Sequence, residues 1–566
     1  MLLEIKRKIS DGLRKAFLEE FDLQLLEILI ETPPSKELGD LATPICLQVS
    51  KTLKKSPIEI AKTILKNFEN PQVLREVKIA GAGYLNFYLN YQKFSEIVLD
   101  EILKGFEFEK KDLKVCIEHT SANPTGPLHM GRLRNSLIGD CLQRIYKFSG
   151  YEVEVQNWIN DLGKQVAKIA WGFEHNLDYD RDLVKRYEKY KEKPDFQVFF
   201  TYYVSNRVAD EREVDTLLKR CEAGDRKSLE KLRGVARRCL EGQLQTLSRF
   251  GIFYDKIVYE SDSILDGSVE EVMRKLKKSK DLVMIGKNYA LDLRRFGIEK
   301  RSGGTIFQRA NGTSVYRTRD VAYHLSKLSL CDYALNVLGE DHKLEFRELK
   351  AFLKILQIKT PLEACFFNFV NLEDKKMSTR KGEIVSVDEL ADEAYIKALS
   401  ELERRRPELS ERKKREISKA IGIGAIKYNF LRYNPEKSIT FIWRDALNFE
   451  GDSAPYILYA HARCCGILKS EKVEVVEPFL KEEQEINLIR ILSEFKEILE
   501  KSRRENSPHH LAKYANDLAS HFNSFYNELP VLKSRKKRER LMLVKATKIV
   551  LKTCLELLGI KALEEM

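Results

Sequence analysis

A histidine, a glycine and an arginine follow a run of turn-forming residues closely enough to act on one ligand. Residues 123–127 (Asn-Pro-Thr-Gly-Pro) precede His129, Gly131 and Arg132, and apolar residues at helical spacing come next. These side chains therefore fall at a predicted helix start, whose free N–H groups and positive dipole end favour an anion. His129 and Arg132, one helical turn apart, can reach the same anion, and Gly131 lets the backbone approach it. A triphosphate whose α-phosphate gains charge during attack suits this arrangement.

An ordinary helix start with an exposed histidine and arginine is the alternative, and a short His-x-Gly motif alone favours that interpretation. The two common phosphate-binding patterns, Gly-x-x-x-x-Gly-Lys-Ser/Thr and Gly-x-Gly-x-x-Gly, are both missing from the sequence. Neither a P-loop nor a dinucleotide-binding fold therefore competes as an explanation.

A second group of cations, residues 375–382 (Lys-Lys-Met-Ser-Thr-Arg-Lys-Gly), follows a strand-like apolar run. A lysine carries a compact charge on a flexible stem, so a loop bearing Lys376 could close over ATP and neutralise the departing pyrophosphate. The alternative is a solvated basic turn, which such runs usually are. In isolation this motif does not identify a nucleotide site.

The elements around the first motif predict a parallel sheet. Strand-like residues 115–117 precede it, helical spacing runs over residues 133–145, Gly150 ends the helix, and residues 151–155 alternate as the next strand. A strand–helix–strand order is typical of a parallel sheet, in which ligands bind at the carboxyl ends of the strands. We therefore expect a Rossmann-like nucleotide-binding core to begin here.

The same pattern resumes only after a long, highly charged and mostly helical stretch, at residues 315–316 and 333–338, and it ends with the strand at 366–370. A helical insertion thus divides the predicted sheet into two halves, and helical spacing continues from residue 390 to the end. The expected α/β architecture has these parts: a small N-terminal α/β domain (1–105), a Rossmann-like catalytic core (106–177 and 311–389), a mainly helical connective insertion (178–310), a helical junction (390–445) and an all-α C-terminal domain (446–566).

The composition is that of a folded, soluble protein. Hydrophobic residues make up 43% and charged residues 33% of the 566 residues, and neither a signal-peptide pattern nor a long apolar run occurs, so we expect a cytoplasmic protein without membrane contact. The ten cysteines include no Cys-x-x-Cys pair, so we expect neither a zinc site nor a disulfide framework. The net charge of +12 favours a polyanionic partner, although surface ion pairing of a heat-adapted protein is an equal alternative.

Together, the two basic motifs resemble the signatures of class I aminoacyl-tRNA synthetases, which stand after the first and last strands of a split sheet. The sequence departs from that family at two places. Arg132 stands where a second histidine is usual, and Thr379-Arg380 stand where Lys-Ser is usual. Since Arg132 keeps its charge at any working pH, its expected role is electrostatic rather than proton transfer.

Longer segments resemble the arginyl-tRNA synthetases in particular. Residues 118–129 are similar to the segment that opens their catalytic domain, residues 315–320 to their second substrate segment, and residues 443–463 to their helical junction. The resemblance covers nearly the whole chain and thins out only in the insertion. It implies activation of L-arginine by ATP·Mg²⁺ and transfer to the 3′ end of tRNA(Arg), with the C-terminal domain at the anticodon and the N-terminal domain at the tRNA elbow.

The resemblance also implies roles for individual residues. A guanidinium has five donors and no acceptor, so a pocket for arginine should offer carboxylates, here Glu118 and Asp320. The implied catalytic residues are His129, Arg132 and Lys376; the implied ATP-binding residues are His129, Gly131, Arg132, Lys376, Met377 and Ser378; the implied arginine-binding residues are Glu118, Ser121, Asn123, Tyr316, Asp320 and His342. No metal-binding residue is expected, and we expect a monomer.

Three other functions remain open at the level of the sequence. Another class I synthetase or a nucleotidylyltransferase could carry the first motif, although the long helical C-terminal region counts against the nucleotidylyltransferase. A non-catalytic RNA-binding protein with a decayed synthetase fold is the third alternative. The presence of both motifs and both carboxylates argues against decay.

Overall fold

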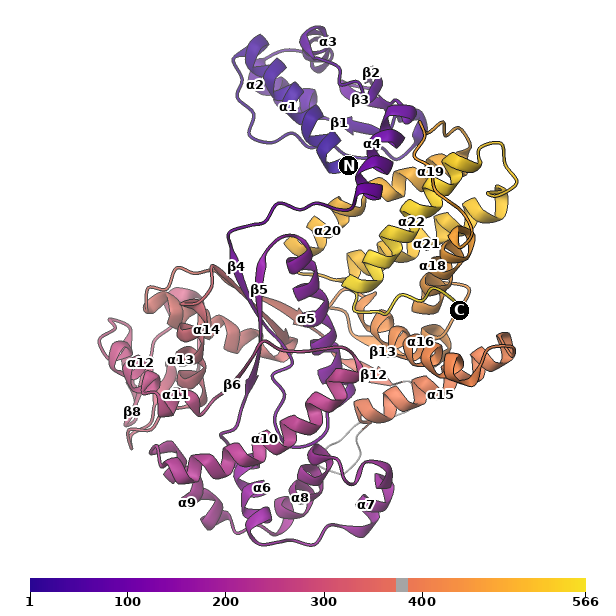
Figure 1. The fold of residues 1–566 in the computed structure, drawn as a ribbon. Helices are drawn as coiled ribbons and strands as arrows, with labels where there is room; N and C mark the ends of the chain where they lie inside the picture. The colour runs from indigo at the N-terminus through magenta and orange to yellow at the C-terminus, as the bar shows by residue number, and fades with distance from the viewer. Residues whose placement is uncertain (373–384) are drawn as a thin grey trace.

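The computed structural model describes residues 1–372 and 385–566. Figure 1 shows an elongated molecule with a parallel sheet in its middle, the helices of the insertion below it, and the helical C-terminal domain beside it. The N-terminal domain lies at the top, next to the C-terminal helices. Lys376, Met377 and Ser378 of the predicted ATP site fall outside the described residues.

The N-terminal domain combines helices with an antiparallel sheet of strand order β1-β3-β2. Its first helix forms because apolar side chains recur every three or four residues, so that one face, from Leu2 to Phe17, is buried. The alternating residues Tyr84 to Leu89 form β3, the central strand of this sheet. The elements are α1 (Leu2–Phe21), β1 (Leu41–Thr43), α2 (Ile45–Leu53), α3 (Pro57–Asn67), β2 (Leu74–Ala80), β3 (Tyr84–Leu89) and α4 (Tyr91–Lys104).

The central sheet has the order β11-β10-β4-β5-β6, and every neighbouring pair is parallel. The chain adds β5 and β6 on one side of β4, and later adds β10 and β11 on the other side. The strand order therefore reverses between β4 and β10, and parallel sheets bind ligands at such a reversal. The register places Glu118 of β4 beside Asn336 of β10. The elements of this core are β4 (Lys114–Glu118), α5 (Met130–Phe148), β5 (Glu152–Ile159), β6 (Lys256–Tyr259), α13 (Tyr316–Leu328), β10 (Tyr333–Gly339), α14 (Lys343–Ile355) and β11 (Leu362–Phe367).

The structure differs from the sequence interpretation in the second half of the insertion. Strand β6 lies inside residues 178–310 but belongs to the central sheet, and a separate antiparallel sheet, β7-β8-β9, follows it. Both were missed because each strand has only four residues, too few for alternation to stand out. Residues 315–316, read as the resumption of strand patterning, are instead the N-cap and first residue of α13.

Helices form the first half of the insertion and lie on one side of the sheet (Figure 1). Buried apolar residues of α6, α8, α9 and α10 form one cluster there. Helix α6 (Lys164–Glu174) precedes the insertion and packs against it. The elements of the insertion besides β6 are α7 (Arg181–Arg186), α8 (Pro194–Val208), α9 (Glu211–Glu222), α10 (Arg226–Arg249), α11 (Asp262–Leu265), α12 (Ser268–Leu276), β7 (Leu282–Ile285), β8 (Asn288–Leu291) and β9 (Thr305–Gln308).

Among the described residues from 370 onward, the short strands β12 and β13 pair in parallel, and the other elements are helices. A continuous apolar core joins these helices to α1, α4 and α5, so the N-terminal domain, the sheet and the C-terminal domain share one packing unit. The elements are β12 (Val370–Leu372), α15 (Val387–Arg405), α16 (Glu411–Leu431), β13 (Ile439–Phe441), α17 (Trp443–Ala446), α18 (Ala454–Leu468), α19 (Glu483–Ser493), α20 (Phe495–Arg504), α21 (His509–Glu528) and α22 (Lys537–Leu557).

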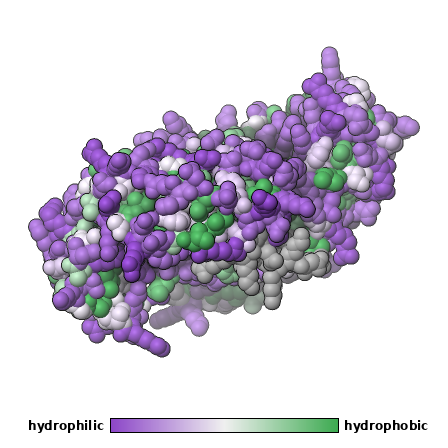
Figure 2. Space-filling model, turned by 90° about the horizontal axis from the view of Figure 1, so that it is seen from below, coloured by the Kyte–Doolittle hydropathy of each residue, from purple (hydrophilic) through white to green (hydrophobic). Residues whose placement is uncertain are grey.

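The surface seen from below in Figure 2 is mostly hydrophilic, and hydrophobic residues form only small separate groups on it. Within the described residues, no helix combines the length and the apolar character that spanning a membrane requires.

Candidate active site

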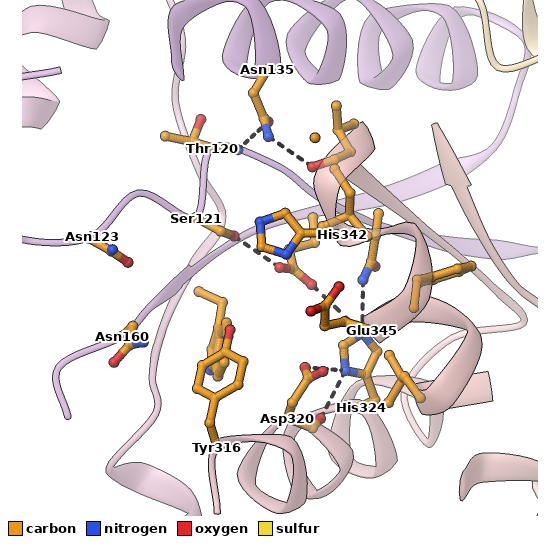
Figure 3. Close-up of a pocket in the computed structure, with 18 of the residues that line it drawn as sticks. Thr120, Ser121, Asn123, Asn135, Asn160, Tyr316, Asp320, His324, His342 and Glu345 are labelled. Carbon is orange, nitrogen blue, oxygen red and sulfur yellow. Dashed lines mark hydrogen bonds and ion pairs between the residues drawn. The ribbon is translucent and has the colours of Figure 1, made fainter. Parts of the chain in front are cut away.

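A pocket opens at the carboxyl ends of β4 and β10, where the strand order reverses. Its volume is about 730 Å³ when the open solvent at its mouth is included. Figure 3 shows side chains from the loop after β4, from α13 and from the start of α14 pointing into it. All six predicted arginine-binding residues line this pocket: Glu118, Ser121, Asn123, Tyr316, Asp320 and His342.

Glu118, the last residue of β4, is buried and already has partners on both oxygens. The ammonium of Lys327, fully buried in α13, donates to Glu118 Oε2 over 2.6 Å, and the Ser121 hydroxyl donates to Oε1 over 2.9 Å. Burial alone would raise the pKa of Glu118, but the charge of Lys327 and these hydrogen bonds outweigh it and lower the pKa below its usual value. The carboxylate is therefore ionised and oriented before any ligand arrives.

A chain of hydrogen bonds continues from Lys327 to the second predicted carboxylate. Lys327 also donates to Asn336 Oδ1 over 2.7 Å, so Asn336 Nδ2 donates to His324 Nε2 over 2.9 Å. With Nε2 as the acceptor, His324 Nδ1 donates to the backbone carbonyl of Asp320 over 2.9 Å, and the Asp320 carboxylate oxygen Oδ1 lies 3.0 Å from the same nitrogen. Glu118 and Asp320 are therefore fixed by one buried network rather than by two independent contacts.

Aromatic rings form another wall of the pocket. Tyr316, the first residue of α13, packs on Trp158 with ring centroids 5.4 Å apart, and Trp158 stacks on Tyr323 at 5.5 Å. Burial, followed by the charges of Asp320 and Glu260, raises the pKa of Tyr316 well above its ordinary value. Tyr316 therefore offers a neutral hydroxyl and an electron-rich ring face to a cationic ligand.

The same first turn of α13 is tied to the sheet by its arginine. Arg319 donates from Nε to Glu260, directly after β6, over 2.5 Å. Burial of Glu260 raises its pKa to about 7, although the Arg319 charge opposes the shift. This contact holds the turn that carries Tyr316 and Asp320.

The loop after β4 is strained where it turns into the pocket. Thr120 and Ser121 have positive φ angles of 71° and 37°, a region that favours glycine. Their N–H groups donate to the side chains of Asn135 and Asn157 over 2.6 and 3.1 Å. Asn135 also donates to the carbonyl of Val337 in β10 over 2.9 Å, so it fastens the strained loop to the neighbouring strand.

His129 and Arg132 line a second cavity, which meets the first at Asn123 and Arg132. His129 is the N-cap of α5, and a Cβ on Gly131 would lie 3.1 Å from the His129 ring, which explains the glycine. Burial and then the Arg132 charge lower the pKa of His129 to about 4. Burial also lowers the pKa of the Arg132 guanidinium, and the neighbouring Asp341 and Tyr316 oppose this shift.

The described residues that follow 373–384 lie next to this helix start. Strand β12 ends at Leu372, and on the other side Ser386 pairs with His129 in an isolated bridge. The N–H of Val387 donates to the carbonyl of Leu128 over 2.8 Å. Residues 386 and 387 are thus fixed directly beside the His129 motif.

Sequence analysis missed several polar residues of the pocket. Lys327, His324 and Asn336 complete the network described above, and Glu345 and Asn160 line the cavity. His324 could have been found because it lies one helical turn after Asp320, on the same face. Among the described residues, no group of three or more His, Cys, Asp or Glu side chains could hold a metal ion.

Models of three protein families match the chain. The model described as "tRNA synthetases class I (R), catalytic domain" matches residues 94–443, "Arginyl tRNA synthetase N terminal domain" matches residues 3–89, and "DALR anticodon binding domain" matches residues 457–566. The chain belongs to the arginyl-tRNA synthetase family. The family shown by these matches is the one that the sequence motifs indicated.

Arginyl-tRNA synthetases from several organisms align with this chain over nearly their full length. The arginine–tRNA ligase of Methanocella arvoryzae is 43% identical, covering 93% of this chain and 94% of that protein. That of Methanocaldococcus jannaschii is 39% identical over 99% of both. The solved arginyl-tRNA synthetase of Thermus thermophilus superimposes with a TM-score of 0.85 at 28% identity, over 99% of this chain and 100% of that one.

Proposed function

We propose that the chain activates L-arginine with ATP and transfers it to the 3′ end of tRNA(Arg). The observation that carries this proposal is the pocket in which Glu118, Asp320 and the Tyr316 ring converge, and which meets the His129 cavity at Asn123 and Arg132. An arginine whose guanidinium lies among the carboxylates would direct its own carboxylate toward that junction. Membership of the arginyl-tRNA synthetase family supports the same substrate.

In the activation step, an oxygen of the arginine carboxylate attacks the α-phosphorus of ATP and pyrophosphate leaves. Arg132, the N–H groups at the start of α5 and His129 surround the α-phosphate and stabilise the charge that develops there. With a pKa of about 4, His129 is neutral at pH 7 and hydrogen-bonds rather than transfers a proton. Lys376, which lies outside the described residues, is expected from the family resemblance to supply a further cation, and Mg²⁺ enters with the phosphates of ATP.

In the transfer step, a terminal ribose hydroxyl of the tRNA attacks the carbonyl carbon of arginyl-adenylate, and AMP leaves. The protein contributes position and charge, and no side-chain nucleophile is required. A site that pairs buried carboxylates with a guanidinium leaves them unpaired when a smaller analogue binds, so editing is unnecessary.

A groove in the C-terminal domain supports tRNA as the partner. The exposed rings of Tyr459 and Tyr526 flank Arg463, whose guanidinium lies 4.6 Å from both ring centroids. Lys469 and Lys548 line the same groove. Exposed rings and cations suit unstacked bases and phosphates. The protein would work as a cytoplasmic monomer, with its N-terminal domain as a second tRNA contact.

Arginine-dependent exchange of labelled pyrophosphate into ATP, with and without tRNA(Arg), tests the proposed function. We expect exchange with arginine and none with lysine, and we expect tRNA to be required, as the family resemblance implies. Asp320→Asn should raise the KM for arginine far more than the KM for ATP. If arginine supports no exchange with tRNA(Arg) present, the proposed function is wrong.

A further inference from the structure

A third carboxylate, Glu345, points into the arginine pocket from the first turn of α14. It lines the cavity with Glu118 and Asp320, and Figure 3 places its carboxylate between His342 and His324. Its Oε2 atom is buried and has no hydrogen-bond partner among the described residues. A buried carboxylate oxygen without a partner is costly, and a cationic ligand would supply the missing donors.

The three carboxylates of the pocket are not equivalent. Both oxygens of Glu118 are occupied, one by the buried cation Lys327 and the other by the Ser121 hydroxyl. Asp320 has no lysine or arginine paired with it among the described residues, and its Oδ1 lies 3.0 Å from His324 Nδ1. The anionic charge that remains for a ligand therefore belongs mainly to Asp320 and Glu345.

The two ends of a bound arginine can also be distinguished. Its α-carboxylate must reach the phosphate beside Arg132, so its α-ammonium stays near Asn123, at the junction of the two cavities. In Figure 3, Asn123 lies on the opposite side of the pocket from Glu345, which neighbours Asp320 and His324. The apolar residues Phe346 and Leu349 line the pocket on the α14 side. Glu345 thus faces the end of the pocket that takes the side chain.

We propose that Glu345 binds the guanidinium of arginine together with Asp320, and that Glu118 orders the pocket in its pairing with Lys327. This inference rests on the proposed function. A planar guanidinium presents two donor edges, and one carboxylate on each edge recognises it as a fork, which an ammonium cannot match. Glu345 is therefore a specificity-determining residue for arginine over lysine and over citrulline, its neutral isostere.

A structural role is the alternative for Glu345, because an acid in the first turn of a helix is favoured by the helix dipole. This stabilisation of the helix does not depend on a bound ligand, and it would persist if the carboxylate were exposed to solvent. Removing it would lower the stability of α14 and leave the discrimination between ligands unchanged. The two roles therefore predict different kinetic results.

The test compares Glu345→Gln with the wild type in tRNA-dependent pyrophosphate exchange, using arginine as substrate and 5-guanidinopentanoate, which lacks the α-ammonium, as competitive inhibitor. Loss of a charged hydrogen bond should raise the KM for arginine roughly 10- to 100-fold, with the KM for ATP unchanged. The Ki of 5-guanidinopentanoate should rise by the same factor. Glu271→Gln, which removes an exposed acid of α12 far from the pocket, is the charge-matched control and should change neither constant.

Three results would overturn the inference while leaving the proposed function intact. They are an unchanged KM for arginine, an equal rise of the KM for ATP, and an arginine KM that rises while the Ki of 5-guanidinopentanoate does not. The last result would place Glu345 at the α-ammonium. Glu345→Asp keeps the charge but moves it away from the pocket, so it should raise the KM for arginine less than Glu345→Gln does. It replaces Glu345→Gln in the test if that variant does not fold. Absence of exchange in the wild type would instead refute the proposed function.

Discussion

Lys327 sets the charge of Glu118 from beneath the arginine pocket. It is fully buried, and its ammonium donates hydrogen bonds to Glu118 and Asn336 over 2.6 and 2.7 Å. Without this cation, burial would dominate and the pKa of Glu118 would rise instead of being lowered. The ionised state of the pocket thus depends on a residue that does not line it.

Replacement of Lys327 by methionine should make arginine recognition depend on pH. In the wild type, the lowered pKa keeps Glu118 ionised throughout pH 6–8, so it contributes no pH dependence there. In Lys327→Met the raised pKa leaves Glu118 partly protonated at pH 6, and the KM for arginine should fall roughly 10-fold as the pH rises to 8. Steady-state pyrophosphate exchange over this range measures the effect.

Lys427→Met is the matched control, because Lys427 is also buried but donates to the carbonyl of Gly559, away from the pocket. It should lose stability without acquiring the pH dependence. A Lys327→Met enzyme whose arginine KM is as flat with pH as that of the wild type would contradict this role of Lys327.

Sequence reasoning found the residues of the pocket that stand in recognisable segments, and missed those defined only by the fold. Glu118 and Asp320 stand in segments that resemble a known family, and the structure places both around one cavity. Lys327 and Glu345 carry no motif. Lys327 is distinguished by complete burial opposite Glu118, and Glu345 by an unpaired oxygen, and neither property is visible in a sequence.

At the scale of elements, the contact between α5 and β4 positions the loop that enters the site. Gly139 of α5 lies against His119, the residue after β4, and a Cβ there would come within 2.5 Å of three atoms of the His119 side chain. His119 is buried, and its ring hydrogen-bonds to Thr120 over 3.1 Å. The helix therefore can approach the strand end only with a glycine at this position.

Gly139→Ala should separate α5 from the end of β4. Overpacking of this kind costs about 1–3 kcal/mol, and displacement of Thr120 and Ser121 should also raise the KM for arginine. Thermal unfolding and exchange kinetics measure the two effects. Gly234→Ala in α10, where a Cβ meets nothing within 4 Å, should be neutral or stabilising by up to about 1 kcal/mol. Equal behaviour of the two variants would show that the contact does not constrain the site.

Long helices and strands could be predicted from the sequence, and short strands could not. Helix α5 and strands β4 and β5 were found because long apolar periodicity and the breaker Gly150, with its φ of 91°, marked them. The edge strand β6 has four residues and begins with a lysine, so its membership of the sheet depends on pairing with β5, which is a long-range contact. Local patterns cannot reveal such pairing.

At the scale of the whole molecule, ion pairs connect the N-terminal domain to α19 and α20 of the C-terminal part. Lys6 pairs with Glu497 at 2.8 Å, and Arg490 pairs with Asp40 at 3.1 Å. Figure 1 shows the N-terminal domain beside these helices. The two proposed tRNA-contacting domains are thus held in a fixed relation, partly by charges that salt would screen.

Glu494, the N-cap of α20, introduces a pH dependence into this interface. Burial, followed by the charge of Glu497, raises the pKa of Glu494 to about 7, although Lys6 and Arg490 oppose the shift. Because this pKa lies above the ordinary value, the stability linked to Glu494 is fully present below about pH 4.5 and is lost as the pH rises through 7. The ionised side chain makes no capping hydrogen bond that would compensate.

Glu494→Gln, which stays neutral at every pH, should therefore match the wild type at pH 5 and exceed its melting temperature by roughly 1–3 °C at pH 8. Scanning calorimetry of both proteins at pH 5, 6.5 and 8 measures the difference, and Glu27→Gln, a change at an exposed carboxylate, should show no such trend. A difference that stays constant with pH would mean that Glu494 is ionised throughout this range. The docking of the N-terminal domain would then be insensitive to pH at this contact, and its stability would depend on the exposed ion pairs and the apolar core alone.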